Sequence, residues 1–273
     1  NSLFFRFYPS TLPPISLQAR QKWVDYYHNK FGEEEPYLGV NSLGGYYPVR
    51  YPRASYAAMV STLDENIGLI IKLLKELDIY KNTILFFTSD NGPAYNGGAD
   101  PEWRNAGGPL PAGKGRGKSF LYEGGIRIPH IVTWPGKIKP GSKSNLISAV
   151  WDALPTISQI VDAPITKTVD GISYLPTLLG REKDQKLHSY LYWEYNGMGG
   201  QQAIRFGKWK AIRKGLKQGN NVSIELYNLE TDIREEKDLS KERPEMVKKL
   251  TRFMELEHTT PQVESFKMKT LDH

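Results

Sequence analysis

The chain has 273 residues, 39% hydrophobic and 24% charged, which is an ordinary balance for a globular protein. It has no cysteine, which excludes disulfides, thiolate metal sites and cysteine nucleophiles, and no apolar run approaches the roughly 18 residues of a transmembrane helix. The net charge of +6 fits either a slightly basic surface or the steering of an anionic substrate. The sequence has one local basic patch: Lys208, Lys210, Arg213, Lys214 and Lys217. The other basic residues are interspersed with acids, so we expect no nucleic-acid partner.

The first third of the chain leads from irregular sequence into an α/β pattern. Phe4–Tyr8 has the pattern of a strand, and its apolar run is too short and too broken for a signal peptide. A short helix is expected within Ser16–Phe31. From Arg53 to Leu77, apolar residues recur at helical spacing with charges between them, which predicts an amphipathic helix. The apolar segment Thr83–Thr88 then predicts a buried strand, and a helix followed by a buried strand is typical of α/β folds.

The middle of the chain contains a long loop between two strands. Residues 92–117 are rich in glycine and proline, and a loop of this length in a compact domain is usually functional or disordered. Arg127–Trp134 predicts a second buried strand. Helices are expected at Ala149–Val161 and Leu175–Leu179.

After about residue 185 the pattern changes to short alternating segments. Four antiparallel strands and a final helix are predicted: Ser189–Glu194, Gln202–Phe206, Trp209–Arg213, Ser223–Tyr227 and Pro244–Glu257. We therefore expect an α/β core over residues 1–185 and a small antiparallel α+β subdomain over residues 186–273.

Asp90 and Asn91 follow the predicted Thr83–Thr88 strand directly. In open α/β sheets, ligands bind beyond the carboxyl ends of the strands. Carboxylate and carboxamide oxygens are ligands that suit Ca²⁺ or Mg²⁺. The alternative is an ordinary Asn-Gly turn after a strand. The sequence thus offers a divalent-cation site at Asp90 and Asn91 as a hypothesis.

Lys118 is the candidate for binding an anionic ester group, although most loop lysines are simply solvated. The motif Glu123-Gly124-Gly125 follows it, and could be no more than the turn before the next strand. Arg127 is interpreted as a structural ion-pair former rather than a ligand of the substrate.

Histidines and aromatic residues offer further candidates. His130 is interpreted either as a core or loop-edge histidine or as a substrate contact. His188, His258 and His273 are expected at the surface. The aromatic run Tyr192–Tyr195 and the following loop Gly197–Gln202 fit either a sugar pocket or strand packing, and both interpretations stay open.

The order of these motifs closely resembles the sulfatase family of the alkaline-phosphatase-like superfamily. The matching segments span nearly the whole chain: Leu63-Asp64, Thr88–Gly92, Gly117-Lys118, Tyr122–Pro129, Trp134–Gly136, Asp170–Ser173 with Leu175-Pro176, Gly207–Lys210, and Glu225–Leu229 with Asp232 and Glu235. The resemblance implies part of an alkaline-phosphatase-like α/β/α sandwich that carries the small C-terminal subdomain.

The resemblance also implies roles for individual residues. The family residues that match Asp90 and Asn91 bind a divalent cation, usually Ca²⁺, and the lysine that matches Lys118 contacts the sulfate. Cation and lysine together neutralise the ester oxygens. The nucleophile of the family is a formylglycine made from Cys or Ser in a Cys/Ser-x-Pro/Ala-x-Arg motif.

The chain departs from the family pattern in its N-terminal part. Ser16–Arg20 has the Ser and Arg spacing of the nucleophile motif, but Gln18 stands at the Pro/Ala position. The N-terminal pair of metal-binding aspartates is missing, and Pro14 stands where a histidine is expected. We therefore expect the resemblance to cover the C-terminal three-fifths of a sulfatase, with the formylglycine upstream and no turnover by this chain alone.

The function expected from the resemblance is hydrolysis of sulfate esters, on a sulfated carbohydrate or an aryl sulfate. One alternative is a phosphodiesterase or phosphonate hydrolase of the same superfamily. Another is a non-catalytic relative that binds sulfated glycans, or one with a purely structural role. We expect a periplasmic or secreted protein without a membrane partner.

Overall fold

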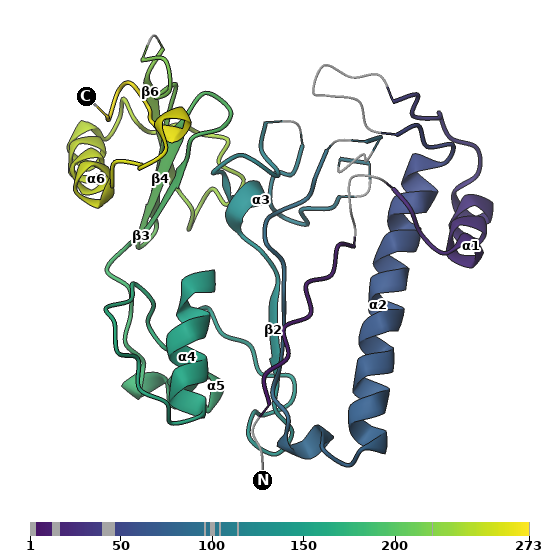
Figure 1. Ribbon diagram of the computed structural model, residues 1–273. Helices are drawn as coiled ribbons and strands as arrows, with labels where there is room; N and C mark the ends of the chain where they lie inside the picture. Colours follow the sequence, from purple (N-terminus) through teal and green to yellow (C-terminus); the bar gives the residue numbers. More distant parts are fainter. Residues whose placement is uncertain are drawn as a thin grey trace. The chain divides into compact units, whose positions relative to one another are not determined.

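The computed structural model describes residues 4–12, 17–39, 47–95, 97–98, 102–103, 105–113, 115–219 and 221–272 (Figure 1). The chain divides into two compact units. The first comprises residues 1–80, 93–106 and 112–114, and the second comprises residues 81–92, 107–111 and 115–273. Within the described ranges, no helix is both long enough and apolar enough to cross a bilayer.

Two helices, α1 (Gln21–Phe31) and α2 (Pro52–Glu76), pack against each other in the first unit (Figure 1). Both confirm the predicted helices. Proline at the first position suits α2, because its fixed φ is already helical and the missing N–H has no helical partner there. The indole Nε1 of Trp23 on α1 donates to Glu65 Oε2 on α2 at 3.1 Å, which joins the two helices.

The first sheet of the second unit is an antiparallel pair of strands, β1 (Leu85–Thr88) and β2 (His130–Thr133). Both lie where strands are predicted, but the prediction that they are buried is wrong. Phe87 and Ile131 are partners in the ladder, and both side chains are exposed. An apolar run in a sequence indicates a strand without indicating whether another layer covers each of its faces.

Several further helical elements are short. The α-helices are α3 (Glu123–Ile126), α4 (Ala153–Ile160) and α5 (Leu175–Leu178). The 3-10 turns are Tyr80–Asn82, Val150–Asp152, Glu182–Asp184 and Glu264–Phe266. The helices α4 and α5 confirm predictions, whereas α3 corrects one, because the Glu123-Gly124-Gly125 motif is helical.

Four antiparallel strands form the second sheet in chain order: β3 (Leu191–Tyr195), β4 (Gln201–Phe206), β5 (Trp209–Lys214) and β6 (Ser223–Asn228). A two-residue turn at Gly207-Lys208 joins β4 to β5. The helix α6 (Pro244–Glu257) lies along one face of this sheet, beside β4 (Figure 1). The predicted antiparallel part of the fold is confirmed, while a domain boundary at residue 185 stays a prediction.

Each face of the second sheet packs against a different part of the chain. The face toward α6 carries a buried cluster of Ile204, Ala211, Leu226, Leu250 and Met254. The opposite face carries a second cluster, formed with the segment that leads into α3: Leu121, Tyr122, Ala203, Ile212, Tyr227 and Leu229. Neighbouring residues of β4 therefore point to opposite faces, as the twofold period of a strand requires.

The N-terminal segment differs from its prediction. Residues 4–12 form neither strand nor helix, so the predicted Phe4–Tyr8 strand is wrong. The aromatic residues of this segment are exposed, and a β-rich sequence forms a ladder only where a partner strand accepts its hydrogen bonds. Pro14, which carries one of the predicted departures from the family pattern, and Ser16 lie outside the described residues.

Candidate functional site

Asp90 and Asn91 lie in a bend directly after β1, as predicted. The Ser89 hydroxyl donates to the carbonyl oxygen of Asn91 at 3.0 Å, and Asn91 Nδ2 donates to the carbonyl oxygen of Gly92 at 2.9 Å. These local bonds fix the turn. They leave Asp90 as an exposed carboxylate at the end of the strand.

Backbone contacts at glycine hold this turn against α3. The N–H of Gly92 donates to the carbonyl oxygen of Gly125 at 2.8 Å. A Cβ atom on Gly92 would lie 1.8 Å from the carbonyl oxygen of Gly124, closer than real atoms approach. This close contact therefore requires glycine at position 92. Because Gly92 touches α3, the preceding residue Asn91 is held close to that helix.

The loop that carries Lys118 packs against the same short helix. A Cβ atom on Gly125 would lie 2.5 Å from the carbonyl oxygen of Gly117, the residue before Lys118. The Phe120 N–H donates to that same carbonyl oxygen at 3.1 Å, which closes a turn around Lys118. Lys118 itself is half-buried. The backbone on either side of α3 thus gathers the two predicted groups, Asp90-Asn91 and Lys118.

His130 reaches the same end of β1 through the strand register. It is the ladder partner of Thr88, whose hydroxyl donates to the carbonyl oxygen of Pro129 at 3.0 Å. Its ring meets Tyr174 edge-on, with 5.3 Å between the ring centroids. Although the residue as a whole is exposed, burial of the ring lowers the pKa of His130. The imidazole is therefore neutral near pH 7.

The Glu123-Gly124-Gly125 segment carries a buried ionic network. Lys210 Nζ on β5 lies 2.9 Å from Glu123 Oε1 and 3.0 Å from Glu235 Oε1, and the Lys210 side chain is fully buried. The Glu123 N–H donates to Glu235 Oε2 at 2.8 Å. Lys210 therefore belongs to the interior, and the prediction that it contributes to a surface basic patch is wrong.

The pKa values of the two carboxylates in this network shift in opposite directions. Burial would raise the pKa of Glu123, but Lys210, Arg205 and Arg127 together outweigh it and hold the pKa below its ordinary value. Burial raises the pKa of Glu235, and Lys210 offsets only part of that effect. The contact of Arg127 with Glu123, at 3.5 Å, agrees with its interpretation as an ion-pair former.

The oxygen atoms at the end of β1 are of the type that binds a hard cation. They are too few to complete its coordination shell. Asp90 and Asn91 offer carboxylate and amide oxygens, whereas Ca²⁺ takes about six to eight oxygen ligands. Among the described residues, no group of three or more His, Asp or Glu side chains is placed to hold a metal ion. A cation held by this pair would need further oxygen ligands from elsewhere, and the pair alone would bind it only weakly.

Two of the histidines predicted at the surface are instead largely covered, and each lies against carboxylate groups. His188 Nε2 lies 2.8 Å from Asp152 Oδ1, and its side chain is 11% exposed. His258 lies between Glu194 and Asp272, at 2.8 and 2.9 Å, and its side chain is 10% exposed. A single histidine gives no sequence signal for such partners, because the partners are distant in the chain. His273 lies outside the described residues.

The aromatic run on β3 serves mainly as packing. Trp193 joins the buried cluster beside α3 and lies 5.8 Å from Trp151 between ring centroids. Tyr192 faces the other side of the sheet, where its hydroxyl accepts a hydrogen bond from Gln202 Nε2 at 2.8 Å. These contacts favour strand packing over the sugar pocket.

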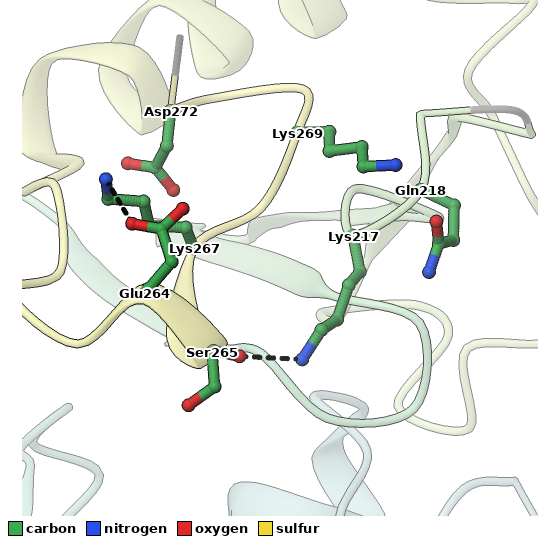
Figure 2. Close-up of a pocket in the computed structure, with 7 residues that line it drawn as sticks. All are labelled: Lys217, Gln218, Glu264, Ser265, Lys267, Lys269 and Asp272. Carbon is green, nitrogen blue, oxygen red and sulfur yellow. Dashed lines mark hydrogen bonds and ion pairs between the residues drawn. The ribbon is translucent and has the colours of Figure 1, made fainter.

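A hollow of about 270 Å³ lies near the C-terminus, away from the predicted site residues, and Lys217, Lys267 and Lys269 line it together with Glu264 and Asp272. Figure 2 shows that two of the lysines are already engaged. Lys267 pairs with Glu264 at 2.7 Å, and Lys217 donates to the carbonyl oxygen of Ser265 at 3.0 Å. None of Asp90, Asn91, Lys118 and His130 lines this hollow.

Two family models match the chain, and together they cover most of it. The sulfatase model matches residues 16–163. The model for the C-terminal region of N-sulphoglucosamine sulphohydrolase matches residues 116–260. The first match contains Asp90, Asn91, Lys118 and His130, and the second contains the whole four-stranded sheet.

Curated relatives agree with these models. An N-acetylgalactosamine-6-O-sulfatase of Bacteroides thetaiotaomicron is 31% identical over 82% of this chain and 47% of its own length. The human N-acetylgalactosamine-6-sulfatase is 32% identical over 79% of this chain and 42% of its own length. The chain thus spans about half the length of the curated relatives that it matches.

Solved structures show the same fold. A crystal structure of Ps i-CgsB in complex with k-i-k-neocarrahexaose covers 96% of this chain with a TM-score of 0.66 and 26% identity; the match spans 50% of that structure's chain. A structure from work on glycosaminoglycan metabolism by Bacteroides thetaiotaomicron covers 74% of this chain, and 44% of its own, with a TM-score of 0.61 and 29% identity. The fold is therefore the α/β fold of the alkaline-phosphatase-like superfamily, and the chain belongs to the sulfatase family.

Proposed function

We propose that this chain supplies the sulfate-binding side of a sulfate-ester hydrolase. The observation that carries the proposal is the packing of two loops on α3. Gly92 is hydrogen-bonded to Gly125, and Gly117 lies against that same residue, so the Asp90-Asn91 turn and Lys118 are held around one short helix. Membership of the sulfatase family supports a sulfate ester as the group that they bind.

In this proposal, two positive charges flank the anionic ester group. Lys118 contributes a positive charge to the sulfate oxygens, where charge is stabilised in the transition state. Asp90 and Asn91 would hold a divalent cation, Ca²⁺ or alternatively Mg²⁺, which when bound acts as a Lewis acid on the ester oxygens. His130, neutral near pH 7, contributes to substrate binding as a hydrogen-bonding group.

We infer that the substrate is a sulfated carbohydrate. The supporting fact is that curated relatives are N-acetylgalactosamine-6-sulfatases. The family nucleophile, formylglycine, attacks the sulfur atom, and the 273 residues contain no Cys/Ser-x-Pro/Ala-x-Arg motif that would form it. We therefore propose that the nucleophile comes from residues other than these, and that the protein acts in the periplasm or outside the cell.

A binding experiment tests the proposal without requiring turnover. Isothermal titration of the chain with N-acetylgalactosamine 6-sulfate in CaCl₂ should show binding that Lys118→Ala weakens about 10- to 100-fold, as expected for a hydrogen bond to a charged group. Lys208→Ala is the matched control, because that lysine is exposed and paired only loosely with Glu230, at 3.6 Å. Equal affinities of the Lys118 and Lys208 variants would refute the role of Lys118.

The corresponding 6-phosphate and an aryl sulfate separate the remaining alternatives. Tighter binding of the phosphate would favour a phosphodiesterase or phosphonate hydrolase. Hydrolysis of p-nitrophenyl sulfate should be absent. If it scaled with the purified chain and disappeared in Lys118→Ala, the role of Lys118 would stand and the external nucleophile would be wrong.

A further inference from the structure

Gln201 is a buried glutamine of β4, and both the nitrogen and the oxygen of its side-chain amide form hydrogen bonds with the same loop. Its Nε2 atom donates to the carbonyl oxygen of Ser119 at 3.1 Å. Its Oε1 atom accepts from the N–H of Leu121 at 3.3 Å. The residue is only 1% exposed. A side chain of the second sheet thus spans the turn that follows Lys118 directly.

The turn that Gln201 spans has an unfavourable backbone conformation. Ser119 has a φ of +74°, which lies in the left-handed region. Residues other than glycine, asparagine and aspartate are uncommon there. Such conformations persist where surrounding contacts enforce them, and they concentrate at functional sites. The two hydrogen bonds from Gln201 are contacts of this kind, because they bind the backbone on either side of Phe120.

The position of Lys118 depends on this turn from both directions. Before it, the Gly117 carbonyl oxygen accepts the Phe120 N–H and lies against Gly125 of α3. After it, the Ser119 carbonyl oxygen is held by Gln201. Loss of the Gln201 contacts would free the residue next to Lys118 to leave its strained conformation.

We propose that Gln201 is a positioning residue that fixes Lys118 for binding the sulfate group. The inference rests on the proposed function, since it assumes that Lys118 contacts the sulfate. The proposal gives the second sheet a role in supporting the site, although the site residues themselves lie outside this sheet. The same face of β4 and β5 also anchors α3, through Arg205 and Lys210 to Glu123.

The neighbouring residue provides a matched control. Gln202 is also fully buried on β4, but it faces α6, where its Nε2 atom donates to the hydroxyl of Tyr192 at 2.8 Å and to the carbonyl oxygen of Met254 at 3.4 Å. Gln201→Met and Gln202→Met remove the same amide from adjacent positions. Only the first removes bonds to the Lys118 turn.

The test reads the environment of Lys118 directly. The 273-residue chain is treated with acetic anhydride, with and without inorganic sulfate, and acetylation of Lys118 is followed by peptide mass spectrometry. Sulfate should slow this acetylation in the wild type. Gln201→Met should reduce the protection about fivefold, the loss that corresponds to one hydrogen bond, while Gln202→Met keeps it. Amide exchange at Leu121 should also accelerate only in Gln201→Met.

The possible outcomes separate the inference from the proposed function. If sulfate protects Lys118 equally in the wild type and in Gln201→Met, the positioning role is wrong and the proposed function stands. If sulfate does not protect Lys118 in the wild type, the proposed function fails and the inference fails with it. Equal losses in the two methionine variants indicate a general structural effect and also overturn the inference.

A second pair of variants covers the case in which Gln201→Met does not fold. Gln201→Glu preserves the size of the side chain and the acceptor for Leu121, but at pH 8 it has no proton to donate to Ser119, so protection should again fall. Ser119→Gly in that background should restore part of it, because glycine adopts a positive φ at little cost. Wild-type protection in Gln201→Glu would contradict the proposal.

Discussion

The ammonium group of Lys210 lies 2.9 Å from the carboxylate of Glu123, and both side chains are buried. This pair joins β5 to α3, the helix around which Asn91 and Lys118 are gathered. The stability of the candidate site is therefore tied to the second sheet.

Removal of the buried cation should be strongly destabilising. Lys210→Met removes the buried cation between Glu123 and Glu235 and leaves Glu123 only its longer contacts with Arg127 and Arg205, so we expect a loss of about 3–5 kcal/mol. Lys208→Met removes an exposed lysine two positions away and should change the stability by no more than about 0.5 kcal/mol. Urea denaturation of the two variants measures the difference, and similar midpoints would contradict the structural role of Lys210.

The two partners of Lys210 should not be equivalent at pH 7. Glu123 has a lowered pKa, so its ionised form contributes stability above pH 4.5 that is lost as the pH falls through the folded pKa. Glu235 has a raised pKa, so its contribution is fully present below pH 4.5 and is lost as the pH rises through the folded value. Glu123→Gln should therefore lower the melting temperature at pH 7 more than Glu235→Gln does, and the reverse order would show that this assignment is wrong.

The close approach of the loops to α3 depends on glycine. A Cβ atom on Gly124 would lie 1.5 Å from the carbonyl oxygen of Pro111, so Gly124→Ala should displace the loop backbone and destabilise the fold. Gly68→Ala is the opposite case, because Gly68 lies in α2 with no atom within 4 Å of its Cβ position. We expect this variant to gain about 0.5–1 kcal/mol. Thermal unfolding distinguishes the two, and an unchanged or higher melting temperature for Gly124→Ala would refute the packing argument.

The C-terminal segment should be held in a pH-dependent way by His258. Burial lowers the pKa of this imidazole, but hydrogen bonds to Glu194 on β3 and to Asp272 outweigh it and raise the pKa. The stabilisation is therefore complete below pH 6.5 and is lost as the pH rises through the raised pKa of the folded protein. The melting temperature should fall between pH 6.5 and pH 9, and less steeply in His258→Gln. Identical slopes would mean that His258 does not carry the effect.

The secondary structure was largely predictable because its signals are local. The amphipathic spacing of α2, the Pro244 start of α6 and the alternation of β3 to β6 all appear in the sequence within a few residues of each other. The exposure of β1 was not predictable in this way, because the burial of Phe87 depends on which layer covers it.

The candidate site residues stand out in the sequence, whereas the contacts that hold them in place do not. Asp90, Asn91, Lys118 and His130 were identified from motifs, and the structure gathers their backbones at the end of β1 and around α3. The partners of Lys210 are far away in the sequence, so its burial could be suggested only by its position on the same strand face as Ile212. Gln201 gave no signal, since two hydrogen bonds to a distant backbone leave no pattern in the chain.

The central claim is that Lys118 and a cation held by Asp90 and Asn91 act on the same sulfate group. It is tested most directly by titrating N-acetylgalactosamine 6-sulfate into the chain at increasing CaCl₂, because two ligands that contact each other must strengthen each other's binding. We predict that Ca²⁺ binds weakly, at roughly 10⁻⁴–10⁻³ M, that it tightens binding of the sulfated sugar, and that Asp90→Asn abolishes this coupling while Lys118→Ala weakens binding at every Ca²⁺ concentration. Sulfated-sugar binding that responds neither to Ca²⁺ nor to the loss of Lys118 would contradict the claim.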